Sequence, residues 1–291
     1  MHSTPTDTDS SQAQPAAAAA VPLKVILPRR GWLPVNWREL WRYRELLFFL
    51  TWRDVQVRYR QTVLGVLWAF LQPFLKLVIF SVIFGGLAKI DSEGFPYPIF
   101  VFAGMLPWQF FSEALTRSSG SVVGSSSLIT KVYFPRLIVP LSSVGACLVD
   151  FLISFVILFG LMAHYRLAPS WAMLAVFPLT ALTVAVALGV GIWLSALTVA
   201  YRDFRYVVPF AVQIWMFLTP VIYPVRIIPA RWHWLVSLNP MSGIVDAWRS
   251  AILGKAFAWG NLGISCAVAA VVLILGLHYF RRVESSFADI V

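Results

Sequence analysis

Long apolar stretches separated by short polar segments follow one another along this chain from residue 64 onward. A helix of about 20 apolar residues is long enough to cross the hydrocarbon core of a bilayer. We also expect a bend at Pro73 in the first stretch and a break at Pro107 in the second, because proline removes a helical hydrogen bond. The pattern predicts an all-α integral membrane protein with six spans, at residues 64–87, 97–117, 137–162, 171–200, 205–222 and 261–279.

Two further segments are apolar in part but do not read as spans. In residues 37–60, basic and apolar residues recur at helical spacing. The basic residues, such as Arg42, would form one face of a helix, and the apolar residues, such as Trp52, would form another. Such a pattern predicts an amphipathic helix that lies in the membrane interface. Residues 225–252 are interrupted by prolines and a glycine, and they predict a re-entrant hairpin of two short helices between the fifth and sixth spans.

The distribution of basic residues predicts the orientation. With the N-terminus in the cytoplasm, the inner segments hold 16 Lys and Arg residues and the outer segments hold six. Cytoplasmic segments carry the excess of Lys and Arg, so both termini are expected inside. The predicted organisation is a disordered tail (1–30), an interface helix (31–62), a six-span domain (63–282) and a C-terminal tail (283–291).

Composition narrows the class of function. The chain is 59% hydrophobic and 12% charged, with a net charge of +10. Its basic residues flank the apolar stretches, which is typical of a membrane protein and disfavours a nucleic-acid partner. The two cysteines, Cys147 and Cys266, lie inside apolar stretches and form neither a metal-binding spacing nor a disulfide framework.

No catalytic constellation is visible in the sequence. The 13 carboxylates are scattered, the four histidines stand apart, and no phosphate-binding GxxxxGK[ST] loop occurs. We therefore expect no catalytic residue, no metal and no cofactor in this chain. A membrane-embedded glycosyltransferase is disfavoured because it would need a convergent acidic site.

Two charged residues fall inside predicted spans, Lys76 in the first and Asp150 in the third. Charges at such a depth are expected to pair or to face a water-filled pathway. We expect the two to lie at similar depth and to form a pair, within one subunit or across a dimer. The alternatives are that both line one pathway, or that they take part in proton coupling.

Aromatic residues are abundant, and most tryptophans stand near span ends, as in interfacial belts. Trp68, Phe70, Trp215 and Phe217 lie further inside. Aromatic rings offer flat apolar faces suited to the C–H faces of sugars. We assign these four residues and Tyr223 to a candidate substrate pathway, with packing between helices as the alternative.

Several ordered motifs resemble a known family over about residues 37–285. They are RYRQTVLGVLWAFLQPF (58–74), GMLPWQFF (104–111), LITKVYFPR (128–136), YRDFRYVVPF (201–210), LTPVIYP (218–224) and LNPM (238–241). They are similar to the permease subunits of ABC-2 type polysaccharide exporters, which move O-antigen, teichoic acid and related lipid-linked glycans.

The resemblance implies a homodimeric permease in a bacterial inner membrane that carries two copies of a separate ABC ATPase, which bind ATP and Mg. It implies that residues 125–135 form a coupling helix that docks on the ATPase, and that the hairpin at 225–252 gates the outer mouth. Serine is expected to cap the coupling helix. The docking residues would be Leu128, Ile129, Lys131, Val132, Tyr133 and Phe134, with a second contact at Arg53 and Asp54 of the interface helix.

The cargo implied is a lipid-linked polysaccharide, with membrane lipids around the chain. Arg44, Arg58 and Arg60 are candidates to attract the diphosphate of the carrier lipid, or else the heads of anionic lipids. Two alternatives stay open. One is an ABC-2 permease for drugs or lipids, and the other is a proton-coupled transporter or flippase.

Overall fold

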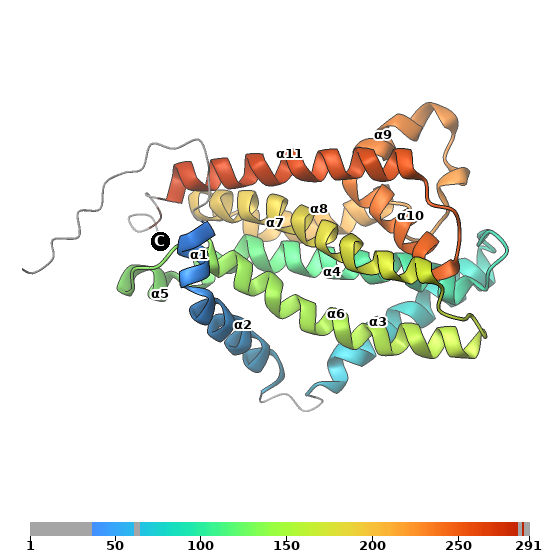
Figure 1. The fold of residues 1–291 in the computed structure, drawn as a ribbon, viewed down its shortest axis with the longest axis horizontal. Helices are drawn as coiled ribbons and strands as arrows, with labels where there is room; N and C mark the ends of the chain where they lie inside the picture. Colours follow the sequence, from blue (N-terminus) through green and yellow to red (C-terminus); the bar gives the residue numbers. More distant parts are fainter. Residues whose placement is uncertain (1–36, 61–64, 285–286, 288–291) are drawn as a thin grey trace, which may run out of the picture. The chain divides into compact units, whose positions relative to one another are not determined.

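The computed structural model describes residues 37–60, 65–284 and 287, and all of them belong to one compact unit. The expected disordered tail at 1–30 and most of the C-terminal tail lie outside the described residues. Helices account for the regular structure, and the described residues contain no strand (Figure 1). The α-helices are α1 (Trp37–Arg42), α2 (Arg44–Tyr59), α3 (Leu67–Phe80), α4 (Tyr97–Gly124), α5 (Ser126–Lys131), α6 (Ile138–His164), α7 (Val176–Ala200), α8 (Phe204–Leu218), α9 (His233–Leu238), α10 (Pro240–Leu253) and α11 (Trp259–Val283).

Within the described residues, five helical segments are long and apolar enough to cross a membrane, which makes the chain a multi-pass membrane protein. They are Leu67–Leu87, Tyr97–Gly124, Ile138–His164, Trp171–Ala200 and Trp259–Val283, in agreement with five of the six predicted spans. The remaining one corresponds to α8, whose 15 residues extend only about 22 Å at 1.5 Å per residue. The fifth predicted span therefore stays a prediction.

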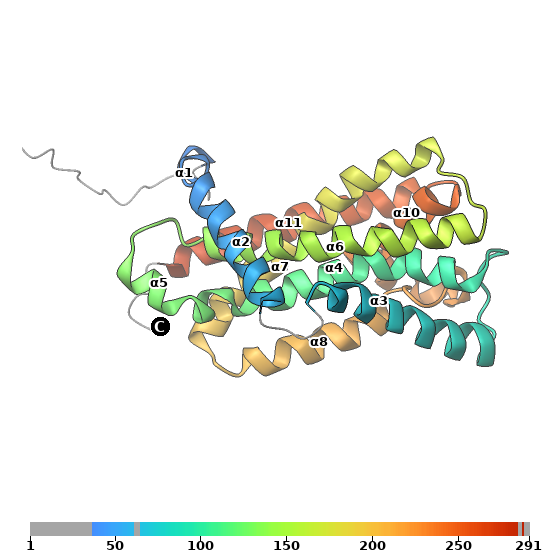
Figure 2. The same ribbon diagram turned by 90° about the horizontal axis from the view of Figure 1, so that it is seen from below.

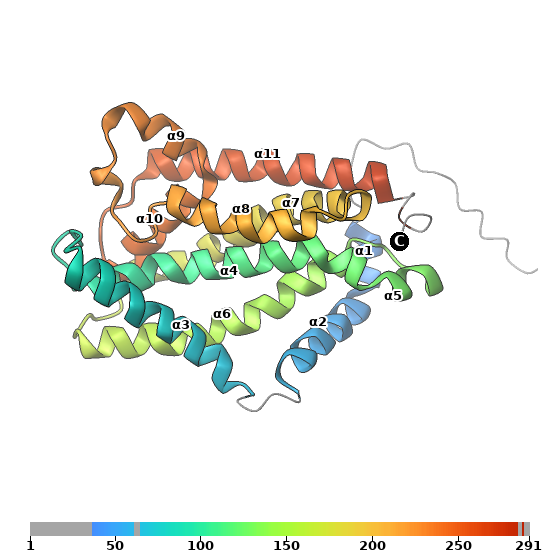
Figure 3. The same cartoon turned by 180° about the vertical axis from the view of Figure 1, so that it is seen from behind.

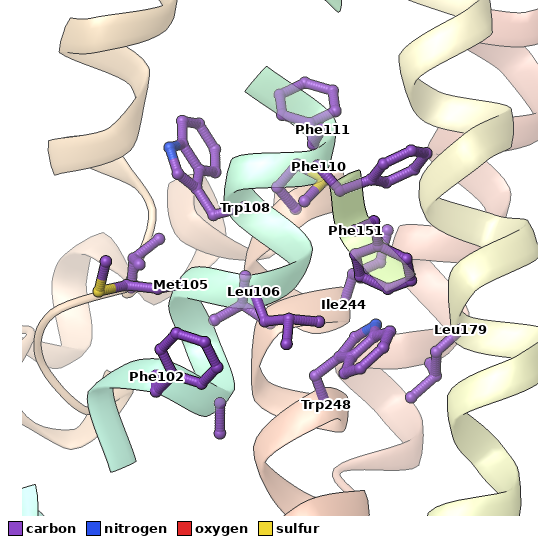
Figure 4. Close-up of a cluster of buried hydrophobic side chains, with 14 of the residues drawn as sticks. Phe102, Met105, Leu106, Trp108, Phe110, Phe111, Phe151, Leu179, Ile244 and Trp248 are labelled. Carbon is purple, nitrogen blue, oxygen red and sulfur yellow. The ribbon is translucent and has the colours of Figure 1, made fainter. Parts of the chain in front are cut away.

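Helix α4 occupies the centre of the bundle. It packs against α6, α7 and α10, and 78% of its most apolar window is buried. Figure 4 shows how its aromatic and aliphatic side chains meet Phe151 from α6 and Trp248 from α10. By contrast, only 11% of the corresponding window of α3 is buried, so α3 presents most of its apolar surface outward.

Both prolines inside the first two spans are accommodated without ending a helix. The predicted break at Pro107 is wrong, because α4 continues for 28 residues through it. Pro73 likewise lies within α3, and the irregular part of that span comes later, where Ser81–Leu87 is π-helical. Proline removes one hydrogen bond, and burial of α4 on all sides stabilises the helix against that loss.

The predicted interface helix forms as two pieces rather than one. Helices α1 and α2 are separated at Tyr43, and α2 packs against α6 near one end of the bundle (Figure 2). Several large apolar side chains remain exposed along these helices, among them Trp41 at 70%, Phe48 at 72% and Trp52 at 52%. Exposed aromatic rings beside a basic face are what an interfacial helix requires.

The hairpin region contains the two short helices that the sequence predicts. Helix α9 ends at Leu238, and α10 begins at once with Asn239 at its N-cap, where the side chain accepts a hydrogen bond from the backbone N–H of Met241. Helix α10 ends at Gly254, whose left-handed backbone (φ +69°) is the usual helix terminator. Almost every residue of α10 is buried against α4, α7 and α11.

Helices α7 and α11 touch through their backbones. A Cβ atom on Gly276 would lie 2.1 Å from the carbonyl oxygen of Gly189, and one on Gly189 would lie 2.8 Å from the backbone of Leu273. Small residues allow this close approach between membrane helices. The contact joins the last span to the centre of the bundle.

Candidate functional site

A cavity of about 560 Å³ opens between the C-terminal end of α2 and helices α3, α4 and α6. Figure 3 shows α2 and α3 diverging beside α4 and α6 in this region. Each of three helices contributes a stripe of residues spaced by three or four positions, so that one face of each helix lines the cavity. The stripes include Trp68, Gln72 and Lys76 on α3, Gln109, Glu113 and Arg117 on α4, and Cys147, Asp150 and Ser154 on α6.

The two acidic residues of the cavity are engaged by basic residues. Asp150 forms an ion pair with Arg58 and accepts a hydrogen bond from the hydroxyl of Tyr59, which fastens the end of α2 to α6. Glu113 pairs with Arg117 one turn later on α4 and lies 3.9 Å from Arg58. Charged pairs of this kind are expected where ionisable groups sit at membrane depth.

The predicted pair between Lys76 and Asp150 does not form within one subunit, because Asp150 pairs with Arg58 instead, and a pair across a dimer stays a prediction. Lys76 lines the same cavity and forms no ion pair with any residue in the described part of the chain. The geometry therefore agrees with the alternative that both residues face one polar space. Proton coupling stays untested.

Of the arginines proposed for lipid diphosphate, only Arg58 lines the cavity. Arg44 lies over the ring of Trp41 at 5.5 Å on the side of the interface helix, and Arg60 is exposed just after α2. The sequence interpretation missed Gln109, Glu113 and Arg117. Their spacing of four residues along an apolar helix was the signal that could have found them.

The candidate pathway aromatics are dispersed. Trp68 lines the cavity and is half exposed, whereas Phe70 stacks on Phe74 with ring centroids 5.9 Å apart. Trp215 packs edge-on against Phe111. Phe217 is 54% exposed, and its carbonyl accepts a hydrogen bond from Tyr223. Phe70, Trp215 and Tyr223 pack against the main buried cluster, and their role in a substrate pathway stays a prediction.

A polar network holds the hairpin to the rest of the chain. Asn239 accepts a hydrogen bond from Trp215 at 3.1 Å and donates one to Thr219 at 2.9 Å. Arg249, which is 2% exposed, donates to the backbone carbonyls of Phe100, Val221 and Tyr223 and lies 4.1 Å from the ring of Phe100. Burial lowers the pKa of Arg249 to about 10, so the side chain remains a cation at neutral pH.

Two ion pairs tie the loop before α4 to the hairpin region. Asp91 pairs with Arg226, and Glu93 pairs with Lys255. Together with the hydrogen bonds from Arg249 to the carbonyls of Val221 and Tyr223, these pairs hold the irregular segment between α8 and α9 against the rest of the chain. The sequence interpretation missed Arg249, because a single arginine in a segment of mixed polarity has no distinguishing pattern.

Helix α5 stands at the end of the bundle that also holds α1 (Figure 1). Two of its expected docking side chains, Ile129 and Phe134, are 7% and 5% exposed and pack in a cluster with residues such as Leu50 and Phe280. Their assignment to an exposed apolar plug is wrong in this structure. They anchor the segment because burying two large apolar side chains stabilises it by several kcal/mol, at roughly 1.5–3 kcal/mol each.

The outward surface of this segment consists of other side chains. Val132 is 51% exposed, Tyr133 is 70% exposed and Lys131 is exposed, while Leu128 is partly buried. Ser125 occupies the N-cap position of α5, but its side chain forms no capping hydrogen bond, contrary to the expectation.

The second expected contact lies on α2. Arg53 and Asp54 form an ion pair with each other at 2.8 Å, and both side chains remain partly exposed. The pair leaves charge of both signs on the surface of α2, where it is accessible to another protein.

The fold and these surfaces define a class: a multi-pass helical membrane protein with a lateral polar cavity and a short helix exposed at one end. The sequence model of the ABC-2 type transporter family matches residues 45–253. The chain belongs to the ABC-2 type transporter family.

Individual relatives align over nearly their whole length. The O-antigen export system permease protein RfbA of Myxococcus xanthus is 30% identical over 257 residues, which cover 87% of this chain and 97% of that protein. RfbA of Klebsiella pneumoniae is 28% identical, covering 84% of this chain and 95% of that protein. The polysialic acid transport protein KpsM of Escherichia coli is 24% identical, covering 80% and 92%.

Proposed function

We propose that this chain is the permease subunit of an ATP-driven exporter that moves a lipid-linked polysaccharide out of the cytoplasm. The observation that carries the proposal is the full-length similarity to permeases named for O-antigen export and polysialic acid transport. Permeases for drugs or lipids would share the family fold, and the names of these relatives favour a polysaccharide.

The proposed partner is a separate ABC ATPase that binds ATP and Mg. The exposed side chains of Lys131, Val132 and Tyr133 give α5 an apolar and basic surface for such a partner. Buried Ile129 and Phe134 fix that surface to the bundle, so a movement of the partner would be passed to the spans. ATP drives transport only because it binds the states of the complex with different affinity.

The proposed assembly is a homodimer in a bacterial inner membrane with both termini in the cytoplasm. The excess of basic residues near the α5 end supports this orientation. The chain has no internal repeat, so two copies related by a two-fold axis would enclose a passage between equivalent surfaces. The hairpin from η3 (Val225–Ile227) to α10 would lie at the outer mouth as its gate.

Co-purification tests the ATPase partner. The wild-type chain should retain the ATPase encoded with it, and Tyr133→Asp should lose it, because the change places a charge in the proposed apolar contact. An exposed control on α9, Trp234→Asp, should retain the ATPase. Equal retention by Tyr133→Asp and the wild type would contradict docking at α5.

Glycan export requires a separate measurement in cells. Deletion of this chain should leave lipid-linked glycan on the inner side of the membrane, and the wild-type chain should restore export. Normal surface glycan in the deletion strain, with altered export of a drug or a lipid instead, would contradict the proposed cargo while leaving the family unchanged.

A further inference from the structure

We propose that the cavity between α2, α3, α4 and α6 binds the phosphate-bearing headgroup of a lipid. The proposal concerns Lys76 on α3, Gln109 on α4 and Arg58 near the end of α2, which all line this cavity. The identity of this lipid as the carrier of a glycan rests on the proposed export function. The binding of a phosphate-bearing headgroup does not rest on it.

The cavity holds hydrogen-bond donors that lack acceptors. Within the described residues, the Nε of Arg58 and the Nε2 of Gln109 are buried and have no hydrogen-bond partner. The ammonium group of Lys76 forms no ion pair there, and it lines the same space. All three groups donate, and phosphate oxygens are acceptors that bind such donors strongly.

The charge balance of the cavity also favours an anion. Its three cationic residues are Arg58, Lys76 and Arg117, and its two acids are Glu113 and Asp150. Each acid already pairs with an arginine, and Lys76 forms no ion pair among the described residues, so the residues lining the cavity carry one net positive charge. A cation at membrane depth needs a partner or water, and an anionic guest supplies a partner. A metal cation would instead be repelled by Lys76.

The surroundings point to a lipid rather than free phosphate. The cavity measures about 560 Å³, within the roughly 300–1,000 Å³ typical of ligand sites. Beside it, the outer face of α3 is apolar, with Leu75 45% and Ile79 53% exposed. A hydrocarbon chain can lie on that face while its headgroup enters the cavity. Trp68 borders both surfaces and is half exposed.

The depth of the site separates it from an ordinary surface contact. Lys76 is nine residues beyond the first residue of α3, which places it about 14 Å along the helix at 1.5 Å per residue. A headgroup that reaches Lys76 has left the level of its neighbours in the leaflet. Arg58, which pairs with Asp150, stands near the end of α2 and lines the same cavity as Lys76.

Direct binding to the full-length chain tests the proposal. The purified chain is incubated with labelled undecaprenyl diphosphate, with phosphatidylglycerol, or with phosphatidylcholine, whose headgroup has no net charge. Dissociation constants are measured for the wild type, Lys76→Met, Gln109→Leu and the control Lys89→Met, which removes the same charge from an exposed loop outside the cavity. Thermal unfolding verifies that each variant is folded.

We expect Lys76→Met to weaken binding of the anionic lipid at least about tenfold, the effect of losing one charge-assisted hydrogen bond. Gln109→Leu should weaken it less, and Lys89→Met should leave it unchanged. Tighter binding of undecaprenyl diphosphate assigns the site to the carrier lipid, and equal binding of phosphatidylglycerol assigns it to the headgroups of membrane phospholipids. Equal constants for Lys76→Met and Lys89→Met, or no preference of the wild type for either anionic lipid over phosphatidylcholine, would overturn the proposal.

The export assay in cells separates this result from the proposed function. Lys76-dependent binding in a chain that does not export glycan would support the site and refute the function. Unchanged binding by Lys76→Met in a chain that exports glycan normally would refute the site alone.

Discussion

Replacement of Arg249 by methionine tests whether one buried side chain holds the segment between α8 and α10 in place. Methionine keeps much of the apolar length of arginine and removes every donor. The guanidinium group donates one short hydrogen bond, to Val221, and two longer ones, to Phe100 at 3.4 Å and Tyr223 at 3.3 Å. The variant leaves all three carbonyls without this partner.

The expected loss follows from these contacts. A short hydrogen bond from a charged donor is worth about 1.5–3 kcal/mol, and each long one contributes nearer to ~0.5 kcal/mol. Loss of the cation from the face of the Phe100 ring removes about 1 kcal/mol more. We expect Arg249→Met to lower the free energy of unfolding by about 3–5 kcal/mol.

Two assays measure the effect on the purified chain in detergent. Thermal unfolding, followed by tryptophan fluorescence, should shift to a clearly lower midpoint. Trypsin should cleave faster after Arg226 and Arg231, which lie in the segment that Arg249 fastens. The control is Arg231→Met, which replaces an exposed arginine that lies over the ring of Trp232, and this variant should unfold as the wild type does. An unchanged midpoint for Arg249→Met, together with unchanged cleavage at Arg226, would refute the reasoning.

Three further changes test the packing, the electrostatics and the docking surface. Gly276→Leu should lower the unfolding midpoint by the equivalent of about 3 kcal/mol or more, because the leucine side chain would overlap the backbone of α7. Gly263→Leu, on the open side of α11, should leave the midpoint unchanged. Equal midpoints for the two variants would contradict the helix contact. Burial raises the pKa of Asp246, so ionisation is unfavourable in the folded chain; Asp246→Asn should be more stable than the wild type at pH 8, and the difference should shrink as the pH falls through that raised pKa. A difference independent of pH would contradict this assignment. Phe134→Ala should lower the free energy of unfolding by about 3 kcal/mol or more, because Phe134 is buried. Tyr133→Ala should leave it unchanged and weaken ATPase binding, because Tyr133 is exposed. A larger loss of stability in Tyr133→Ala than in Phe134→Ala would contradict the burial of Phe134.

The spans and the hairpin were accessible from the sequence because their signals are local. A run of about 20 apolar residues predicts a span without knowledge of its neighbours, and the Asn-Pro step at residue 239 marks the start of α10. The prediction failed at Pro107, where packing on all sides outweighs the local effect of proline. It also failed at Tyr43, where the helical period continues although the helix is divided in two.

The residues of the cavity could be predicted from the sequence only in part. Lys76 and Asp150 stood out because they are charges in apolar helices, but their partners depend on how α2, α3 and α6 meet. Asp150 pairs with Arg58, 92 positions away in the chain, and no spacing rule predicts a contact of that kind. The burial of Ile129 and Phe134 was likewise not predictable from local sequence. Their apolar character was evident, but which side of α5 meets the bundle is decided by tertiary packing.

The cluster beneath α5 joins residues from distant parts of the chain, with Leu50 from α2, Val122 from α4, Ile138 from α6, Ile192 from α7 and Phe280 from α11. Close-packed side chains transmit displacement rather than absorb it. A force applied to α5 is thus distributed over five other helices at once. Moving any one of these helices away from the cluster would open a void among its side chains. Helix α5, which is only six residues long, is thereby coupled to the whole bundle.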